Sequence, residues 1–209
     1  MSYQQETSFR LTSDASLTYA IKQTVAPAME PVTLAELKSH LRVWITNDDT
    51  LITALGVAAR KYYERAIRRQ LVTAQYELRM NWWPPDVKFT LPFPPLVSVQ
   101  SIYYTDTFGN QNLWDPSQYI VDTKREPGNV WLEWNVVWPN IRGYQDSVIV
   151  DYTAGYGDNT VQSEEDKLAI KWLTAIWYRN REAASEMPLS ELPIGLSGII
   201  RSRRIGGYP

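Results

Sequence analysis

The sequence predicts an α+β fold, in which a helical core of two major helices and a short one packs with an antiparallel β domain. Apolar residues recur at helical spacing over 47–69 and again over 163–181. Six runs rich in β-branched and aromatic residues lie between these helices. The two ends lack long patterns of this kind, so the chain divides into an extended N-terminal arm with a short strand (1–29), a core (30–182) and an extended C-terminal tail (183–209).

The N-terminal arm contains one ordered segment, and the core opens with a short helix. Leu17, Tyr19 and Ile21 alternate with smaller or polar residues, which predicts a short strand over 16–25. Thr33-Leu-Ala-Glu36 is a capping-box pattern, since its hydroxyl and carboxylate can satisfy the first free N–H groups of a helix. We therefore expect a helix over 33–43.

The two long helices begin with acidic residues, and turn formers separate the strands between them. Asn47, Asp48 and Asp49 are expected to cap the helix over 47–69, and Ser163 with Glu164, Glu165 and Asp166 the helix over 163–181. Pro-rich and Gly/Asn-rich breaks predict a hairpin-built β region over 71–155. Its expected strands are 71–80, 87–91, 97–105, 119–122, 130–134 and 148–152.

Composition excludes several classes of chemistry. The chain has 209 residues, 44% of them hydrophobic, with nine Trp and thirteen Tyr, so it is too apolar for a disordered protein. It has no Cys and one His, which excludes a disulfide framework, a thiolate zinc site and a His-rich metal site. The net charge of −2 provides no overall attraction to nucleic acid. Neither a secretory leader nor a membrane span is recognisable, so we expect a cytoplasm-like compartment.

The candidates for catalysis have simpler structural explanations, and we expect no catalytic residue, metal or cofactor. His40 follows Glu36 by one helical turn, and its neighbour Ser39 points to another face. The acidic clusters at 48–49 and 164–166 are explained by helix capping. Gly155-Tyr-Gly-Asp158 lacks the Gly-Lys-Ser/Thr ending of a phosphate-binding loop.

Two surface motifs suggest binding instead. One is a basic patch on the helix over 47–69, although Glu64 lies one turn from two of its arginines, and cations are favoured near the C-terminus of any helix. The other is Trp82-Trp83 followed by two prolines, which suits either a sugar-stacking platform or burial in a core or interface. The patch comprises Arg60, Lys61, Arg65, Arg68 and Arg69.

The C-terminal tail mixes apolar residues with Pro and Gly, so no long helix is expected there. An apolar extension beyond the last core helix needs a surface to bind. The candidate partner-binding residues are Leu192, Ile194, Leu196, Ile199 and Ile200, followed by Arg201, Arg203 and Arg204.

Several phrases, taken in order, resemble the head–tail connector proteins of tailed bacteriophages, of the gp6-like and gp8-like family. The resemblance spans roughly 30–195 and rests on the ordered series rather than on one phrase. The phrases are Glu30-Pro-Val-Thr-Leu-Ala-Glu-Leu-Lys-Ser-His-Leu-Arg-Val43, Asp48-Asp-Thr-Leu-Ile-Thr-Ala-Leu55, Leu91-Pro-Phe-Pro-Pro-Leu-Val-Ser-Val-Gln-Ser-Ile102, Tyr119-Ile-Val-Asp122, Val150-Asp-Tyr-Thr-Ala-Gly-Tyr-Gly-Asp158 and Trp177-Tyr-Arg-Asn-Arg-Glu182.

The resemblance implies a structural virion protein without a catalytic site. Such a subunit forms a ring, of twelve copies, beneath the portal protein, and joins the DNA-filled head to a tail or neck protein. DNA passes through the lumen without specific binding, and no membrane is involved. The expected location is the virion neck, with the host cytoplasm as the site of assembly. The C-terminal tail is then expected to bind the portal.

Three alternatives stay open on the sequence. The N-terminal arm, rather than the tail, contacts the portal. A tail-associated carbohydrate- or receptor-binding domain uses Trp82, Trp83 and other loop aromatics. A small hydrolase is built around His40 or the acidic clusters.

Overall fold

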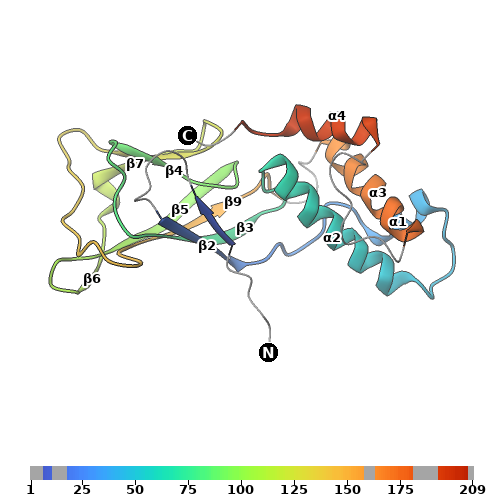
Figure 1. Ribbon diagram of the computed structural model, residues 1–209, viewed down its shortest axis with the longest axis horizontal. Coiled ribbons are helices and arrows are strands. Elements are labelled where there is room, and N and C mark those ends of the chain that lie inside the picture. Colours follow the sequence, from blue (N-terminus) through green and yellow to red (C-terminus); the bar gives the residue numbers. More distant parts are fainter. Residues whose placement is uncertain (1–6, 11–17, 158–162, 181–192, 207–209) are drawn as a thin grey trace. The chain divides into compact units, whose positions relative to one another are not determined.

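The computed structural model describes residues 7–10, 18–157, 163–180 and 193–206, and it confirms the α+β class. The chain forms two compact units. The β unit comprises Met1–Pro27 and Thr73–Gly155, and the helical unit comprises Ala28–Val72 and Tyr156–Gly206, within the described ranges. Figure 1 shows strands of the first unit and the helices labelled α1 to α4, which belong to the second. Each unit has its own hydrophobic core.

The β unit holds two antiparallel sheets. The larger has six strands in the order β1-β2-β3-β9-β5-β6, and the smaller has three in the order β4-β8-β7. The six strands in chain order are β1 (Thr7–Arg10), β2 (Thr18–Val25), β3 (Ala74–Met80), β5 (Leu96–Thr105), β6 (Gln111–Leu113) and β9 (Val148–Ala154). The other three are β4 (Lys88–Thr90), β7 (Tyr119–Asp122) and β8 (Asn129–Leu132), and a 3₁₀ turn, η1 (Pro116–Gln118), precedes β7.

Aromatic rings fill part of the β unit's core. Trp83 stacks on Trp138 with ring centroids 4.7 Å apart, and Trp114 lies 4.9 Å from Tyr119. The indole N–H of Trp114 donates to Gln118 Oε1 at 2.8 Å, so the buried ring keeps its polar atom paired. Such ring pairs add stabilisation beyond that of their buried area. They therefore help to hold the loops and short strands of the β unit together.

The helical unit packs α1 (Leu34–Leu41), α2 (Asp49–Ile67), α3 (Glu164–Arg179) and α4 (Ile194–Arg203) around one core. The predicted capping box is present, because Glu36 N donates to Thr33 Oγ1 at 3.2 Å and Thr33 N donates to Glu36 Oε2 at 2.8 Å. α2 presents a buried face to the other helices. The fully buried members of this core include Ile52, Tyr63, Ile67, Leu71, Leu173 and Leu196.

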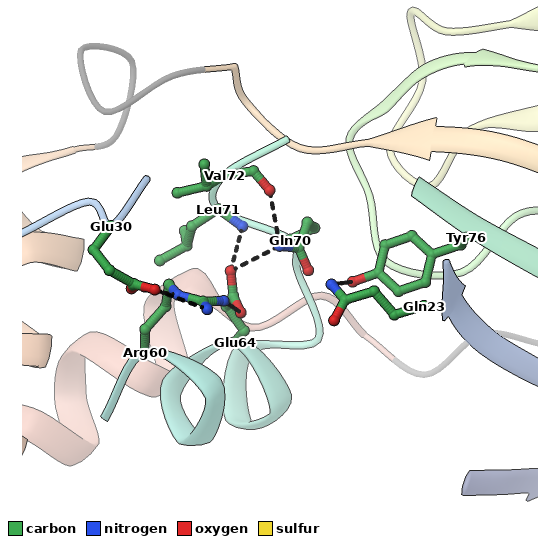
Figure 2. Close-up of polar contacts among 8 residues, drawn as sticks. All are labelled: Gln23, Glu30, Arg60, Glu64, Gln70, Leu71, Val72 and Tyr76. Carbon is green, nitrogen blue, oxygen red and sulfur yellow. Dashed lines mark hydrogen bonds and ion pairs between the residues drawn. The ribbon is translucent and has the colours of Figure 1, made fainter. Parts of the chain in front are cut away.

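A buried polar network fixes the end of α2 (Figure 2). Arg60 donates to Glu30 at 2.6 Å and to Glu64 at 2.7 Å. Glu64 also accepts from Leu71 N at 3.0 Å and from Gln70 Nε2 at 3.1 Å. Burial raises the pKa of Glu64, and the Arg60 guanidinium and the Leu71 N–H oppose that rise. The network therefore fixes Glu30 and the segment 70–72 against the last turns of α2.

The C-terminal helix α4 corrects the sequence prediction of an extended tail, because Ile194–Arg203 are helical. Gly195 and Gly198 each cost about 1 kcal/mol relative to Ala in a helix. Burial of a Leu or Ile side chain contributes about 1.5–3 kcal/mol, and α4 buries both Leu196 and Ile200 in the helical unit's core. Tertiary packing thus outweighs the local propensity that the prediction used.

The compact units also differ from the sequence division into 1–29, 30–182 and 183–209. β2 pairs along its length with β3, which makes 18–25 part of the main sheet. α4 packs on α2 and α3, so 194–203 belong to the helical core. Two short strands, β1 and β6, were not predicted, because runs of three or four residues give too little periodicity to detect.

Candidate interaction surfaces

The residues considered for catalysis serve other roles in the structure. His40 is exposed near the end of α1, and its pKa is lowered by partial desolvation and by the charges of Lys171 and Arg179. Asp49 pairs with Lys38 at 2.5 Å. Asp48 occupies the N-cap position of α2 without a capping hydrogen bond, which corrects the predicted role. Its carboxylate accepts instead from the Tyr178 hydroxyl.

Asp166 is the member of the second acidic cluster with a role that the sequence analysis missed. Ser163 caps α3 by accepting from Asp166 N at 3.2 Å, as predicted. The Asp166 carboxylate, however, is fully buried and accepts from Arg203 at 3.0 and 2.7 Å and from the Tyr63 hydroxyl at 2.7 Å. It therefore ties α4 to α2 and α3. Only the position of α4 could have revealed this pairing.

The basic patch and the glycine turn are likewise partly structural. Arg60 is buried in its ion-pair network, and Arg69 donates to Arg203 O at 2.9 Å and to the Tyr156 hydroxyl. Gly155 and Gly157 adopt positive φ where the chain leaves β9. Lys61 and Arg65 remain exposed on α2. The patch is therefore smaller than the sequence suggested.

The C-terminal candidates fall into three groups. Leu196 and Ile200 are buried in the helical unit's own core, Ile199 packs against it, and Arg203 is paired with Asp166. Ile194 is 91% exposed, and Arg201 and Arg204 also face solvent. Leu192 lies outside the described residues. Three of the candidate side chains are thus exposed to a partner, and they all lie on or beside α4.

The two adjacent tryptophans do not form a free stacking platform. Trp83 is half-buried, stacks on Trp138 and donates to Pro139 O at 3.0 Å. Trp82 is 49% exposed and packs close to Gly143, where a Cβ atom would lie 1.9 Å from the indole. Both rings are used inside the β unit, which removes the main support for carbohydrate recognition by this pair.

Large apolar side chains are exposed at other places. Trp44 and Ile45, in the loop between α1 and α2, are 82% and 61% exposed. Both residues directly follow the predicted end of the first helix. Two adjacent apolar residues in a predicted loop are the sequence feature that could have indicated this exposed pair. Loops of the β unit expose further side chains, which are Phe108, Trp134, Val137 and Tyr144. Exposed aromatic residues of this kind are enriched at protein–protein interfaces.

The helical unit also has an apolar pocket of about 270 Å³. The segment before α1, the first turns of α1 and the N-terminal half of α2 line it. Gly56 leaves space there, because a Cβ atom at this position would lie 2.6 Å from Leu37 Cδ1. The lining residues are Met29, Glu30, Val32, Thr33, Leu34, Leu37, Thr53, Gly56 and Val57.

Among the described residues, no group of three or more His, Cys, Asp and Glu side chains is placed to hold a metal ion. None of the helices within the described ranges is long and apolar enough to cross a bilayer.

No family model matches the chain, and neither does any curated protein. Solved structures do match over 90% of it. A chain from the virion of the native gene transfer agent (GTA) particle is 18% identical, with a TM-score of 0.75 and 97% of that chain covered. Chains from the neck of the empty GTA particle, computed with C6 symmetry, and of the native particle, computed with C12 symmetry, are 20% identical. Their TM-scores are 0.74 and 0.70, and 99% of each is covered.

At these identities, the comparisons show that the chain shares its fold with those particle subunits. The likeness includes both units, since 90% of the chain is covered. It is therefore a likeness of the whole architecture rather than of one common motif.

Proposed function

We propose that this chain is a structural subunit of the neck of a phage-like particle. In this proposal it is a head–tail connector, and twelve copies form a ring beneath the portal and join the DNA-filled head to the tail. The observation that carries the proposal is the whole-chain likeness to subunits of solved virion and neck structures, of which 97–99% is covered. The neck structures were computed with C6 and C12 symmetry, which fits a ring.

The distribution of side chains supports a role in assembly. Both units expose large apolar residues in loops, including Trp44 and Trp134 at more than four-fifths of their surface. A monomer gains nothing from such exposure, whereas a ring with neighbours above and below can bury it.

Imaging tests the proposal. The purified chain is mixed with the portal protein of the same particle, and the product is viewed by electron microscopy. We expect a closed ring of copies on the portal. Portal particles that carry no added ring, with the chain left as free monomers after mixing, would contradict the connector function.

The portal-contacting surface is assigned, within this proposal, to the exposed residues at α4. Ile194 supplies an apolar contact, and Arg201 and Arg204 supply charges for acidic or polar groups on the portal. Leu196 and Ile200 hold α4 in place, so deleting the segment would also disturb the helical core.

Point variants test this assignment better than truncation. Ile194→Asp combined with Arg201→Glu and Arg204→Glu should weaken portal binding while α4 keeps its buried contacts. A matched control, Val87→Asp combined with Lys22→Glu and Lys124→Glu, makes the same change in charge at exposed positions of the β unit. Equal loss in both variants would mean that net charge, rather than this surface, controls binding. Undiminished portal binding by the first variant would show that another part of the chain, for example the N-terminal arm, contacts the portal.

A further inference from the structure

The segment 142–144 of the β unit gathers two aromatic side chains beside one arginine. The guanidinium carbon of Arg142 lies 5.7 Å from the ring centroid of Tyr144. Trp82 packs on Gly143 between them, where a Cβ atom would lie 1.9 Å from the indole and the positive φ favours glycine. Tyr144 is 68% exposed and Trp82 is 49% exposed, so both rings are open to a partner.

The hairpin between β5 and β6 adds a third ring beside Arg142. Arg142 N donates to Thr105 O at 3.0 Å, and a Cβ atom on Gly109 would lie 3.6 Å from Arg142 Nη1. Phe108 immediately precedes Gly109 and is 89% exposed. The exposed residues gathered here are called the Arg142 patch below, and they are Trp82, Phe108, Arg142 and Tyr144.

Hydrogen bonds fix the backbone on both sides of the Arg142 patch. Asp106 accepts from Phe108 N and from Asn110 N, each at 2.9 Å, which closes the tip of the hairpin. Ser147 Oγ accepts from Tyr144 N at 2.9 Å and donates to Tyr144 O at 2.7 Å. A surface held in this way loses little conformational freedom when it binds, so it is preorganised for a partner.

The guanidinium of Arg142 forms no ion pair within the part of the chain that the structure describes. The two carboxylates of the same loops have other partners. Asp106 accepts from amide groups of its own hairpin, and Asp146 pairs with Arg79 at 3.0 Å. Arg142 therefore offers its N–H groups to an acceptor that comes from outside these residues.

We infer that the Arg142 patch binds a segment of a different protein chain, in which a carboxylate is flanked by apolar side chains. Trp, Tyr and Arg dominate the binding energy of protein interfaces, and monomeric proteins rarely expose gathered apolar rings. A guanidinium binds a carboxylate through two parallel hydrogen bonds, and the surrounding rings exclude water from that pair. A nucleic acid needs several cations along its backbone, whereas this patch offers one.

Peptide selection tests the inference on the whole chain. A display library of random dodecapeptides is selected on the wild-type protein, and the Kd of each enriched peptide is measured by fluorescence anisotropy. We expect peptides with an Asp or Glu beside aromatic or aliphatic residues. Arg142→Gln should raise their Kd by about 30-fold, the effect typical of a central interface residue. Arg125→Gln is the matched control at another exposed arginine of the β unit, and it should leave Kd unchanged.

Two further comparisons locate the carboxylate and the rings. Replacing the acidic residue of the peptide by its amide should weaken binding to the wild type by a similar factor. The same replacement should cost nothing more on Arg142→Gln, because both changes break one contact. Phe108→Ala should raise Kd by about 10-fold. Trp134→Ala removes a ring of similar exposure outside the patch and should leave Kd unchanged.

The outcomes separate this inference from the proposed function, because the inference uses the β unit alone and a surface other than α4. Enriched peptides that lack an acidic residue, or whose Kd is the same for Arg142→Gln, would overturn it. Rings formed on the portal would then leave the connector function standing. Peptide binding that depends on Arg142, without rings on the portal, would support the inference and contradict the connector function.

Two other occupants of the Arg142 patch are tested in parallel. A fluorescent oligothymidine that binds the wild type and not Arg142→Gln would identify a nucleic acid as the ligand and overturn the inference. Self-association of the wild type that Arg142→Gln abolishes, measured by sedimentation velocity, would show that a second copy covers the patch. That result would also overturn the assignment to a different protein chain.

Discussion

The helical unit and the β unit hold distant segments together with different interactions. In the helical unit, buried ion pairs join segments far apart in sequence: Arg60 to Glu30, and Arg203 to Asp166. In the β unit, aromatic rings from separate segments pack together, with Trp114 tilted against Trp83, Trp138 and Tyr119. The two units also differ in net charge. The helical unit has two more Lys and Arg residues than Asp and Glu residues, whereas the β unit has four more Asp and Glu residues than Lys and Arg residues.

This difference predicts how each unit responds to change. A buried charge left without its partner is costly, because water cannot replace the lost contact. A ring removed from a stack leaves a cavity that its neighbours fill only in part. The variants below, in order of expected effect, test whether the two kinds of core behave in these ways.

Trp114→Ala should have the largest effect, about 4 kcal/mol of unfolding free energy, because the side chain is 2% exposed at the centre of the ring cluster. Urea unfolding followed by near-UV circular dichroism reports the stacked indoles directly. Trp134→Ala is the control, since this ring is 84% exposed, and should change stability by less than about 0.5 kcal/mol. Equal effects would mean that the cluster does not stabilise the β unit.

Arg203→Ala should cost about 3 kcal/mol, because among the described residues it leaves the fully buried Asp166 carboxylate with only Tyr63 as a side-chain donor. The Arg203 side chain is 26% exposed, so water relieves part of the loss. Far-UV circular dichroism during urea unfolding measures the effect. Arg201→Ala, two residues earlier and exposed, should leave stability unchanged. A neutral result for Arg203→Ala would show that Asp166 finds another partner.

Glu64→Gln should cost about 2 kcal/mol, in the range for hydrogen bonds to charged groups. The carboxylate accepts from Arg60, Gln70 and Leu71 N, and an amide places its own donor against one of them. Thermal unfolding of the variant and of the wild type measures this loss of stability. Lys61→Gln, exposed on the same helix, serves as control. A stability equal to that of the wild type would show that the charge of Glu64 contributes nothing to stability beyond what a neutral side chain of the same shape contributes.

Thr33→Ala should have the smallest effect, about 1 kcal/mol, because it removes one half of the capping box of α1. The N–H of Thr33 holds the pKa of Glu36 below its ordinary value of 4.5. Stabilisation by that carboxylate is therefore present above pH 4.5 and is lost as pH falls through the lower folded pKa. The Thr33 hydroxyl also donates to Glu36 Oε2 at 2.8 Å, and Thr33→Ala removes that bond while it keeps the backbone N–H. The difference in unfolding free energy between variant and wild type, measured across pH, should therefore narrow in acid. A difference that widens would contradict the bond between hydroxyl and carboxylate.

Much of the fold followed from local patterns. The helix predicted over 47–69 is α2 at Asp49–Ile67, and the strand predicted over 119–122 is β7 with the same bounds. These elements were predictable because their periodicity and flanking turns are strong without help from the rest of the chain. The predicted capping box has the same origin, since its residues lie within one turn.

The candidate surfaces were less accessible to sequence reasoning. The prediction treated 183–209 as one tail whose apolar residues bind a partner, but the structure buries Leu196 and Ile200 and exposes Ile194. It also weighed Trp82 and Trp83, whereas the most exposed indoles are Trp44 and Trp134. A pattern of nine Trp residues cannot show which rings find partners within their own unit.

The sequence by itself determined the α+β class, the main helices, the caps at Thr33 and Ser163, and the exclusion of disulfides, thiolate zinc sites and His-rich metal sites. These features depend on neighbours within a few residues or on composition. Tertiary structure decided the helicity of 194–203, the pairing of Asp166 with Arg203 and the position of the apolar pocket between α1 and α2. The physical reason is the same in each case. The free energy that settles these features comes from burial and pairing between residues distant in sequence, and only the folded chain brings them together.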